Sequence, residues 1–199
     1  MGQFNGTRNA DVYLGTAGDD VVTNAGVGLD VILTGFGDDT VTVVPEGRGL
    51  LDILPDVVNM GPGNDHLIID YRSATAPVVL EAPLFDSSAG GLLGGITLGG
   101  LNAFSFTGAD RFTIRTGSGA DDVSGGSGSD SFNTGRGDDH IFGGAGIDRI
   151  NGGAGADTMI GGQGDDYYRV DNAGDRVVEN PNEGHDTVQS VVSFSLGGS

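Results

Sequence analysis

The chain of 199 residues contains no cysteine and no lysine. Without cysteine it can form no disulfide, no thiol nucleophile and no Cys-ligated zinc site. Without lysine it can form no Walker P-loop, no Schiff base and no Ser-x-x-Lys pair. No apolar run approaches the roughly 18 residues that a membrane-spanning helix needs. The missing residue types therefore exclude several enzyme classes, and we expect no membrane span.

Positive charge is also scarce. Nine basic residues face 28 acidic ones, which gives a formal charge of -19. This balance argues against nucleic acids and anionic membranes as partners. A compact chain with this charge repels itself unless cations neutralise it. The composition therefore favours a cation as the ligand.

A nine-residue repeat runs through much of the chain, with turn positions 1–6 and strand positions 7–9. Glycine stands at position 4, aspartate at position 6 and an apolar residue at position 8. Six copies follow one another without a gap: TGSGADDVS (116–124), GGSGSDSFN (125–133), TGRGDDHIF (134–142), GGAGIDRIN (143–151), GGAGADTMI (152–160) and GGQGDDYYR (161–169). Four earlier copies are GTAGDDVVT (15–23), AGVGLDVIL (25–33), TGFGDDTVT (34–42) and MGPGNDHLI (60–68).

One apolar residue in nine does not suit an amphipathic helix, which needs apolar residues three and four positions apart. It suits a strand of three residues in which position 8 points inward. Glycine lets the turn take positive φ angles, so that its carbonyls crowd around one point. The sequence therefore predicts an all-β fold, a parallel β-roll with two short strands and two turns per 18-residue coil.

Stacked turns about 4.8 Å apart can share ions whose bonds to oxygen are about 2.3–2.6 Å long. Oxygen ligands from Asp and from carbonyls select a hard cation, and the wide gap favours Ca²⁺ over Mg²⁺. We expect several Ca²⁺ ions, with four complete sites in residues 116–169. The predicted side-chain ligands are Asp20, Asp30, Asp39, Asp65, Asp121, Asp130, Asp139, Asp148, Asp157 and Asp166. The predicted carbonyl ligands are Gly117, Gly119, Gly126, Gly128, Gly135, Gly137, Gly144, Gly146, Gly153, Gly155, Gly162 and Gly164.

The motif G-G-x-G-x-D-x-U-x, where U is apolar, resembles the RTX (repeats-in-toxin, hemolysin-type) calcium-binding repeat. Residues 167–196 resemble the flank that follows the repeats in many such proteins. The resemblance implies a right-handed parallel β-roll in a secreted bacterial protein. It also implies export by type I secretion machinery through an uncleaved C-terminal signal. The chain would then fold outside the cell, where calcium is plentiful.

The pattern divides the chain into four parts. A partly degenerate repeat block (6–68) precedes a non-repetitive segment (69–115), the six consecutive repeats (116–169) and a C-terminal flank (170–199) that we expect to cap the roll. We interpret 69–115 as a β hairpin or irregular coils beside or within the roll. The alternative is a partner surface at GGLLGGITLGG (90–100).

Catalysis by this chain is not expected. Neighbouring aspartates such as Asp138–Asp139 could suggest a glycosidase, but metal ligation explains carboxylates in a repeated turn more simply. The histidines are scattered and expected to be solvated, and neither HExxH nor GxSxG occurs. The leading hypothesis is an extracellular calcium-binding module.

Two alternatives stay open. The chain could be part of a larger secreted enzyme or toxin, which its abrupt end at SLGGS favours. It could instead be a calcium-dependent adhesin or matrix protein with a cell-surface or polysaccharide ligand.

Overall fold

A computed structural model describes residues 1–7, 10–25, 30–44, 56–80, 84–86, 91–98 and 101–194. These residues form twenty strands and no α-helix, so the predicted all-β class is confirmed. No helix that could cross a membrane occurs among them. Asn9, Gly26 and Gly28 of the early repeats, and parts of the 69–115 segment, lie outside the described residues.

The strands form two sheets that face each other across a narrow core. Sheet A consists of β1 (Gly2–Asn5), β3 (Asp20–Ala25), β5 (Thr40–Val43), β7 (His66–Asp70), β12 (Arg111–Arg115), β14 (Ser131–Asn133), β16 (Arg149–Asn151), β18 (Tyr167–Val170) and β20 (Thr187–Ser190), in this spatial order. Sheet B consists, in spatial order, of β19 (Arg176–Val178), β17 (Thr158–Gln163), β15 (His140–Ala145), β13 (Asp122–Gly126), β8 (Val78–Leu80), β10 (Gly91–Leu98), β11 (Leu101–Ala109), β6 (Asp56–Asn59), β4 (Val31–Leu33) and β2 (Val12–Leu14).

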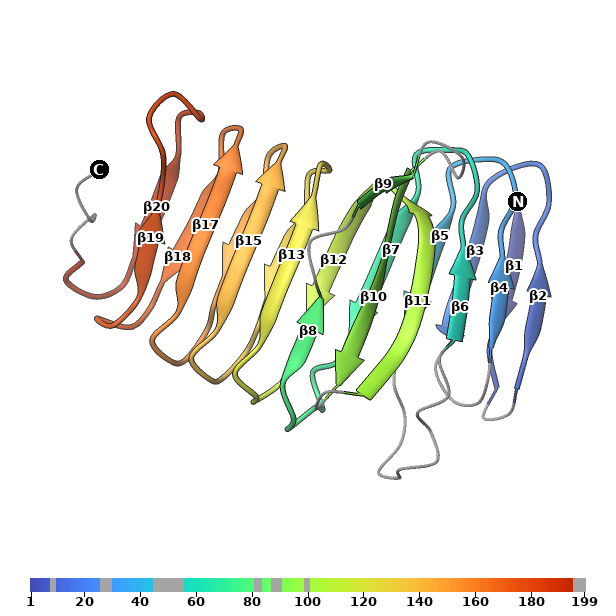
Figure 1. Cartoon of the computed structure of the whole chain (residues 1–199), viewed down its shortest axis with the longest axis horizontal. Helices are drawn as coiled ribbons and strands as arrows, with labels where there is room; N and C mark the ends of the chain where they lie inside the picture. Colours follow the sequence, from blue (N-terminus) through green and yellow to red (C-terminus); the bar gives the residue numbers. More distant parts are fainter. Residues whose placement is uncertain are drawn as a thin grey trace.

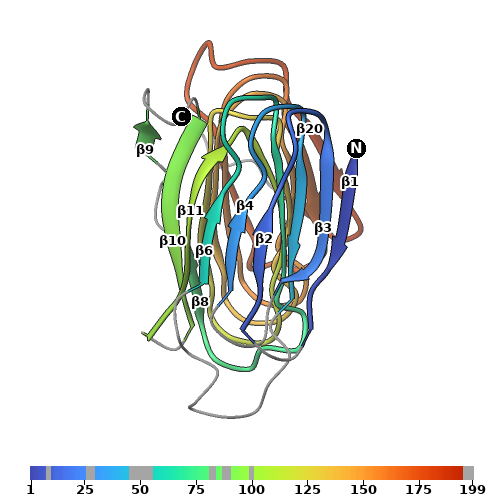
Figure 2. The same ribbon diagram turned by 90° about the vertical axis from the view of Figure 1, so that its right-hand side faces the viewer.

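The chain alternates between the two sheets and so winds into a long flat coil (Figure 1). Seen along the long axis, the sheets form two layers (Figure 2). Every pairing within sheet A is parallel, and β1 and β20 lie at opposite ends of the roll. The predicted parallel β-roll is therefore confirmed.

The register shows the coil length directly. Ser131 pairs with Arg149, which in turn pairs with Tyr167, so one coil takes 18 residues there. Two earlier coils are longer, because Thr40 pairs with His66 and His66 pairs with Arg111. The inserted residues leave the stacking of sheet A intact.

The core lies between the two sheets and is built from their inward side chains. The position 8 residues of the six consecutive repeats are all buried: Val123, Phe132, Ile141, Ile150, Met159 and Tyr168. Neighbouring position 7 side chains point outward, as alternation along a strand requires. Each repeat therefore supplies one core residue at position 8, and longer strands such as β7 bury a second one, Ile69 beside Leu67.

Three strands of sheet B in the consecutive repeats are longer than the three residues expected. β13, β15 and β17 continue into the next turn, where Gly126, Gly144 and Gly162 pair in register. Glycine has no side chain to keep stacked backbones apart, so pairing continues past the strand.

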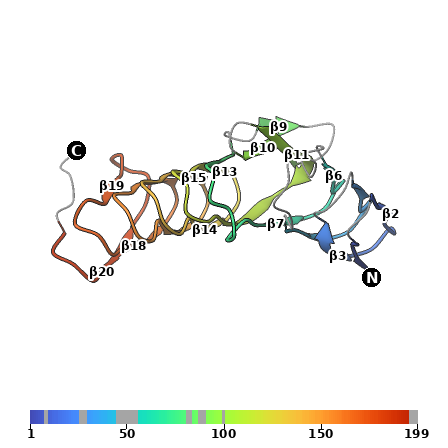
Figure 3. The same cartoon turned by 90° about the horizontal axis from the view of Figure 1, so that it is seen from below.

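The 69–115 segment contributes to both sheets. Its β12 pairs parallel with β7, and its β8 pairs parallel with β13 on one side. On the other side β8 pairs antiparallel with β10, which also pairs antiparallel with β9 (Leu84–Asp86) and β11. The β10–β11 pair is thus inserted into sheet B between β6 and β8, and it stands out from the roll together with β9 (Figure 3).

Candidate calcium sites

Aspartates line the two edges where the chain turns into each sheet. Edge A, at the turns that lead into sheet A, carries Asp20, Asp39, Asp65, Asp110, Asp130, Asp148, Asp166 and Asp186. Edge B, at the turns that lead into sheet B, carries Asp11, Asp30, Asp121, Asp139, Asp157 and Asp175. The ten aspartates predicted as ligands are all buried, with at most 2% of their surface exposed. The structure thus groups all of them in these two rows.

Within each row the aspartates form a ladder of hydrogen bonds. The backbone N–H of Asp130 donates to Asp148 Oδ1, and that of Asp148 donates to Asp166 Oδ1, both at 2.8 Å. On edge B the N–H of Asp121 donates to Asp139 Oδ1 at 2.8 Å. One carboxylate oxygen of each aspartate therefore fixes the stacking of two coils.

The other carboxylate oxygen is left over. Among the described residues, no hydrogen-bond partner reaches the buried Oδ2 of Asp39, Asp65, Asp121, Asp130, Asp139, Asp148, Asp157 or Asp166. A buried carboxylate oxygen without a partner is costly, and native proteins rarely keep one. A whole row of them indicates a ligand that supplies positive charge.

Backbone oxygens converge on the same points. A Cβ added to Gly143 would collide with Asp148 Oδ2 and would lie 2.7 Å from the carbonyl oxygen of Gly161 in the next coil. We call this space beside Gly143 a cradle, and the equivalent cradle beside Gly125 lies between Asp130 Oδ2 and the Gly143 carbonyl. Oxygens of two coils therefore meet in one gap, as sharing of a Ca²⁺ ion requires.

The turn glycines are needed for this geometry. Gly137 and Gly164 have φ angles of 127° and 134°, in the region that favours glycine. A Cβ on Gly164 would also collide with the carbonyl oxygen of Gly146 in the preceding coil. Some predicted carbonyl ligands already accept a stacked N–H, such as Gly117 from Arg136 at 2.8 Å. Such a carbonyl keeps a second lone pair.

When no cation is bound, burial disfavours the ionised form of the aspartates. It raises the pKa of Asp65, Asp130, Asp148 and Asp157 to about 7. Asp20 is the exception: despite burial, N–H groups of Thr16 and Gly2 hold its pKa below the usual value. A cation that replaces the lost hydration would favour the ionised form.

The side chain at position 1 of the repeat changes how far burial raises the pKa of the aspartates. Thr34, Thr116 and Thr134 are buried there, and each hydroxyl donates to a carbonyl of the next coil. The Thr134 hydroxyl also partly offsets the effect of burial on Asp139, whose pKa is raised to about 6. These hydrogen bonds of the threonine hydroxyls were not predicted from the sequence.

The paired carboxylates have different surroundings. Asp139 is buried, whereas Asp138 is exposed and its Oδ1 accepts the N–H of Ala156 at 2.8 Å. Asp165 is likewise exposed and accepts the N–H of His185. In both of these pairs one aspartate thus faces the interior, and its exposed neighbour accepts a hydrogen bond from the next turn.

One histidine differs from expectation. His66 is half-buried, and its Nε2 lies 2.9 Å from Thr113 Oγ1. Burial and the nearby Arg111 and Arg115 lower its pKa to about 4. It was expected to be solvated, but the neighbouring strand β12 covers it.

Asp110 and Asp186 were not predicted as site residues. Asp65 donates its N–H to Asp110 Oδ2 at 2.8 Å, and Asp166 donates its N–H to Asp186 Oδ1 at 3.0 Å. Both aspartates lie in the half-motif G-x-D-x-U, as Gly108-x-Asp110-x-Phe112 and Gly184-x-Asp186-x-Val188. A search for this half-motif would have found them.

Comparison with known proteins gives one family. The RTX calcium-binding nonapeptide repeat family matches residues 5–41, 113–132 and 133–168, in four copies. No curated protein is significantly similar to the chain.

Proposed function

Because this chain carries RTX calcium-binding nonapeptide repeats, we propose that it is a module that folds when it binds Ca²⁺ and so supports folding outside the cell. The observation that carries the proposal is the double row of buried aspartates, eight of which have an Oδ2 atom that no hydrogen-bond partner within the described part of the chain reaches. Such a row opposes folding when the carboxylates are ionised and uncompensated.

The energetics favour folding that depends on bound Ca²⁺. The chain contains 39 glycines, which raise the entropy cost of folding, and folding stacks like charges along each edge. A Ca²⁺ ion held by Asp oxygens and turn carbonyls would supply the missing positive charge. Since the two coils that form a gap come together only in the folded roll, binding stabilises that state by mass action.

We propose that the module has a structural role and no catalytic one. The described position 6 carboxylates lie inside the stacked edges, where each Oδ1 already binds the neighbouring coil. A catalytic carboxylate needs access to a substrate. Secretion through type I machinery follows from the family resemblance, and we propose that the chain crosses that machinery unfolded while calcium is low.

A calcium titration of the chain tests this proposal. Far-UV circular dichroism should show little β signal in EDTA and a cooperative rise with Ca²⁺, while calorimetry counts several ions. Mg²⁺ at the same concentration should not produce the rise, because it requires octahedral geometry and retains its waters. A spectrum that is the same in EDTA and in Ca²⁺ would overturn the proposal.

A further inference from the structure

The last coil departs from the repeat at one edge. Tyr167 of β18 pairs with Thr187 of β20, 20 residues away, whereas the preceding coils are 18 residues long. Glu179 directly follows β19, in the place where the six consecutive repeats carry Gly or Thr. The irregular turn thus brings a glutamate to the end of the edge A row.

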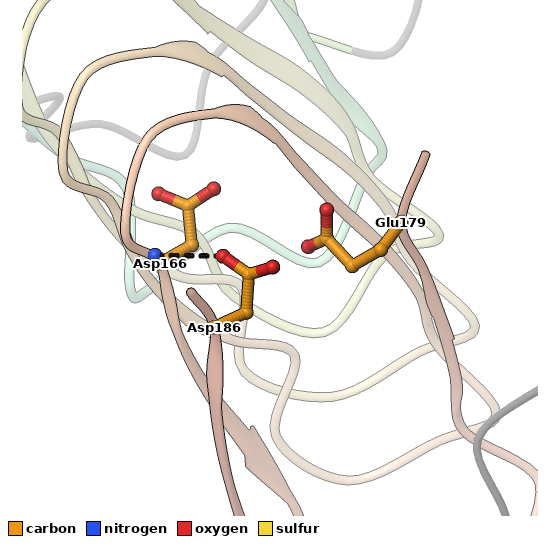
Figure 4. A group of neighbouring side chains, drawn as sticks. All are labelled: Asp166, Glu179 and Asp186. Atoms are coloured by element: carbon orange, nitrogen blue, oxygen red, sulfur yellow. Dashed lines mark hydrogen bonds between the residues drawn. The ribbon is translucent and has the colours of Figure 1, made fainter. Parts of the chain in front are cut away.

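Three carboxylates meet at this turn. Asp166, Glu179 and Asp186 each offer an oxygen, and these oxygens lie within 4.8 Å of one another. Figure 4 shows that they come from three separate segments: the last regular turn, the residue after β19 and the turn before β20. Among the described residues, no arginine or histidine forms a salt bridge with any of them.

Two of the oxygens are buried and lack a partner. Asp166 is only 1% exposed, and no hydrogen bond within the described part of the chain reaches its Oδ2. The same holds for Glu179 Oε2. The hydroxyl of Tyr168 donates to Glu179 Oε1, so Oε2 remains available to a ligand. Asp186 Oδ1 accepts the Asp166 N–H, which ties the third carboxylate to the cluster.

We propose that Asp166, Glu179 and Asp186 form a separate Ca²⁺ site at the C-terminal end of the roll. The ligand must be a hard cation, because the three side chains of the cluster all offer carboxylate oxygens. Oxygens on opposite sides of one Ca²⁺ lie up to about 5 Å apart, so the cluster can surround the ion with little movement. This inference rests on the proposed function for the choice of Ca²⁺ and adds a site with a glutamate ligand.

The site differs from the repeat sites in composition and consequence. A repeat gap offers aspartates and turn carbonyls of similar coils, whereas this site joins the last regular coil to the irregular residues 171–186. Occupancy would therefore hold the C-terminal turn against the roll. We expect removal of Glu179 to release one ion and leave the repeat sites filled.

Glu179→Gln provides the test, because it keeps the size of the side chain and the acceptor for Tyr168. Glu183→Gln is the matched control: it lies in the same turn, removes the same charge and is not part of the cluster. Glu183 bonds Asn180, and a glutamine oxygen can still accept that bond. Bound Ca²⁺ is counted by equilibrium dialysis, and circular dichroism in saturating Ca²⁺ verifies that both variants fold.

Glu179→Gln should bind one Ca²⁺ fewer per chain than the parent, while Glu183→Gln binds the full number. Tb³⁺ gives a second readout, because the Tyr168 hydroxyl contacts Glu179 and can sensitise an ion there. Its tyrosine-excited emission should fall in Glu179→Gln only. An unchanged ion count and unchanged emission in a folded Glu179→Gln would overturn the site. A parent chain that binds no Ca²⁺ would instead refute the proposed function.

Discussion

Replacing Asp148 by asparagine should have opposite effects with and without calcium. Asparagine keeps an oxygen for the N–H of Asp130, which now donates to Asp148 Oδ1 at 2.8 Å. Its amide N–H₂ would take the place of Oδ2, beside the Gly161 carbonyl that shares the Gly143 cradle. The substitution therefore removes a charge and an ion ligand, and it preserves the backbone ladder.

The size of the effect in EDTA follows from the pKa. Burial raises the pKa of Asp148 to about 7, whereas an unfolded aspartate has a pKa of about 3.9. At pH 8 this difference of about 3 units corresponds to at most about 4 kcal/mol of instability. Asp148→Asn should thus stabilise the calcium-free roll by up to that amount. In Ca²⁺ the same variant should lose stability and need more calcium to fold.

Urea unfolding monitored by circular dichroism at pH 8, in EDTA and in excess Ca²⁺, measures both effects. Asp138→Asn is the control: this aspartate is exposed, and its hydrogen bond to Ala156 survives the change. It should alter stability by no more than about 0.5 kcal/mol in either condition. If Asp148→Asn destabilised the chain equally in EDTA and in Ca²⁺, the buried charge would not be what opposes folding.

Three further predictions concern pH, the turns and the threonines. Burial raises the pKa of edge aspartates such as Asp148 to about 7. In EDTA, the stability that the protonated aspartates give to the folded roll is therefore fully present below about pH 4 and is lost as the pH rises through 7. The β signal in EDTA should therefore fall between pH 4 and 8, whereas calcium affinity should rise over the same range. Gly164→Ala should cost a few kcal/mol in urea unfolding, because φ is 134° and the new Cβ would meet a backbone carbonyl. Gly18→Ala should cost almost nothing, since no atom lies within 4 Å of its added Cβ. Thr134→Val should cost about 1–2 kcal/mol, because the Gly152 carbonyl loses a buried donor at 2.9 Å; an unchanged unfolding midpoint would refute this role.

The repeat made the roll and most of its site predictable. A nine-residue period fixes which residue faces the core and which faces the edge, so Ile141 and Asp139 could be placed from their positions alone. The parallel order follows, because equivalent positions stack when each coil has the same length. Local sequence therefore determined structure wherever the period was unbroken.

The remaining features depend on contacts that the period does not encode. Thr134 is at a position where glycine is also accepted, and only the stacked coil reveals the carbonyl that its hydroxyl binds. Asp110 keeps half the motif but follows a 45-residue coil, so its stacking on Asp65 depends on pairing across that insertion. Glu179 joins Asp166 because two extra residues change the course of the last turn.

The insertion in the middle of the roll affects the two edges differently. On sheet A, β7 pairs directly with β12, and the ladder continues from Asp65 to Asp110. On sheet B, β10 and β11 separate β6 from β8 by two extra strands, which widens that sheet by about 9.6 Å at a strand spacing of about 4.8 Å. A gap of this width is too great for one Ca²⁺ to bridge. Among the described residues, edge A therefore provides the continuous row of carboxylates from the first coils to the last, and cations bound there would couple the two repeat blocks into one folding unit.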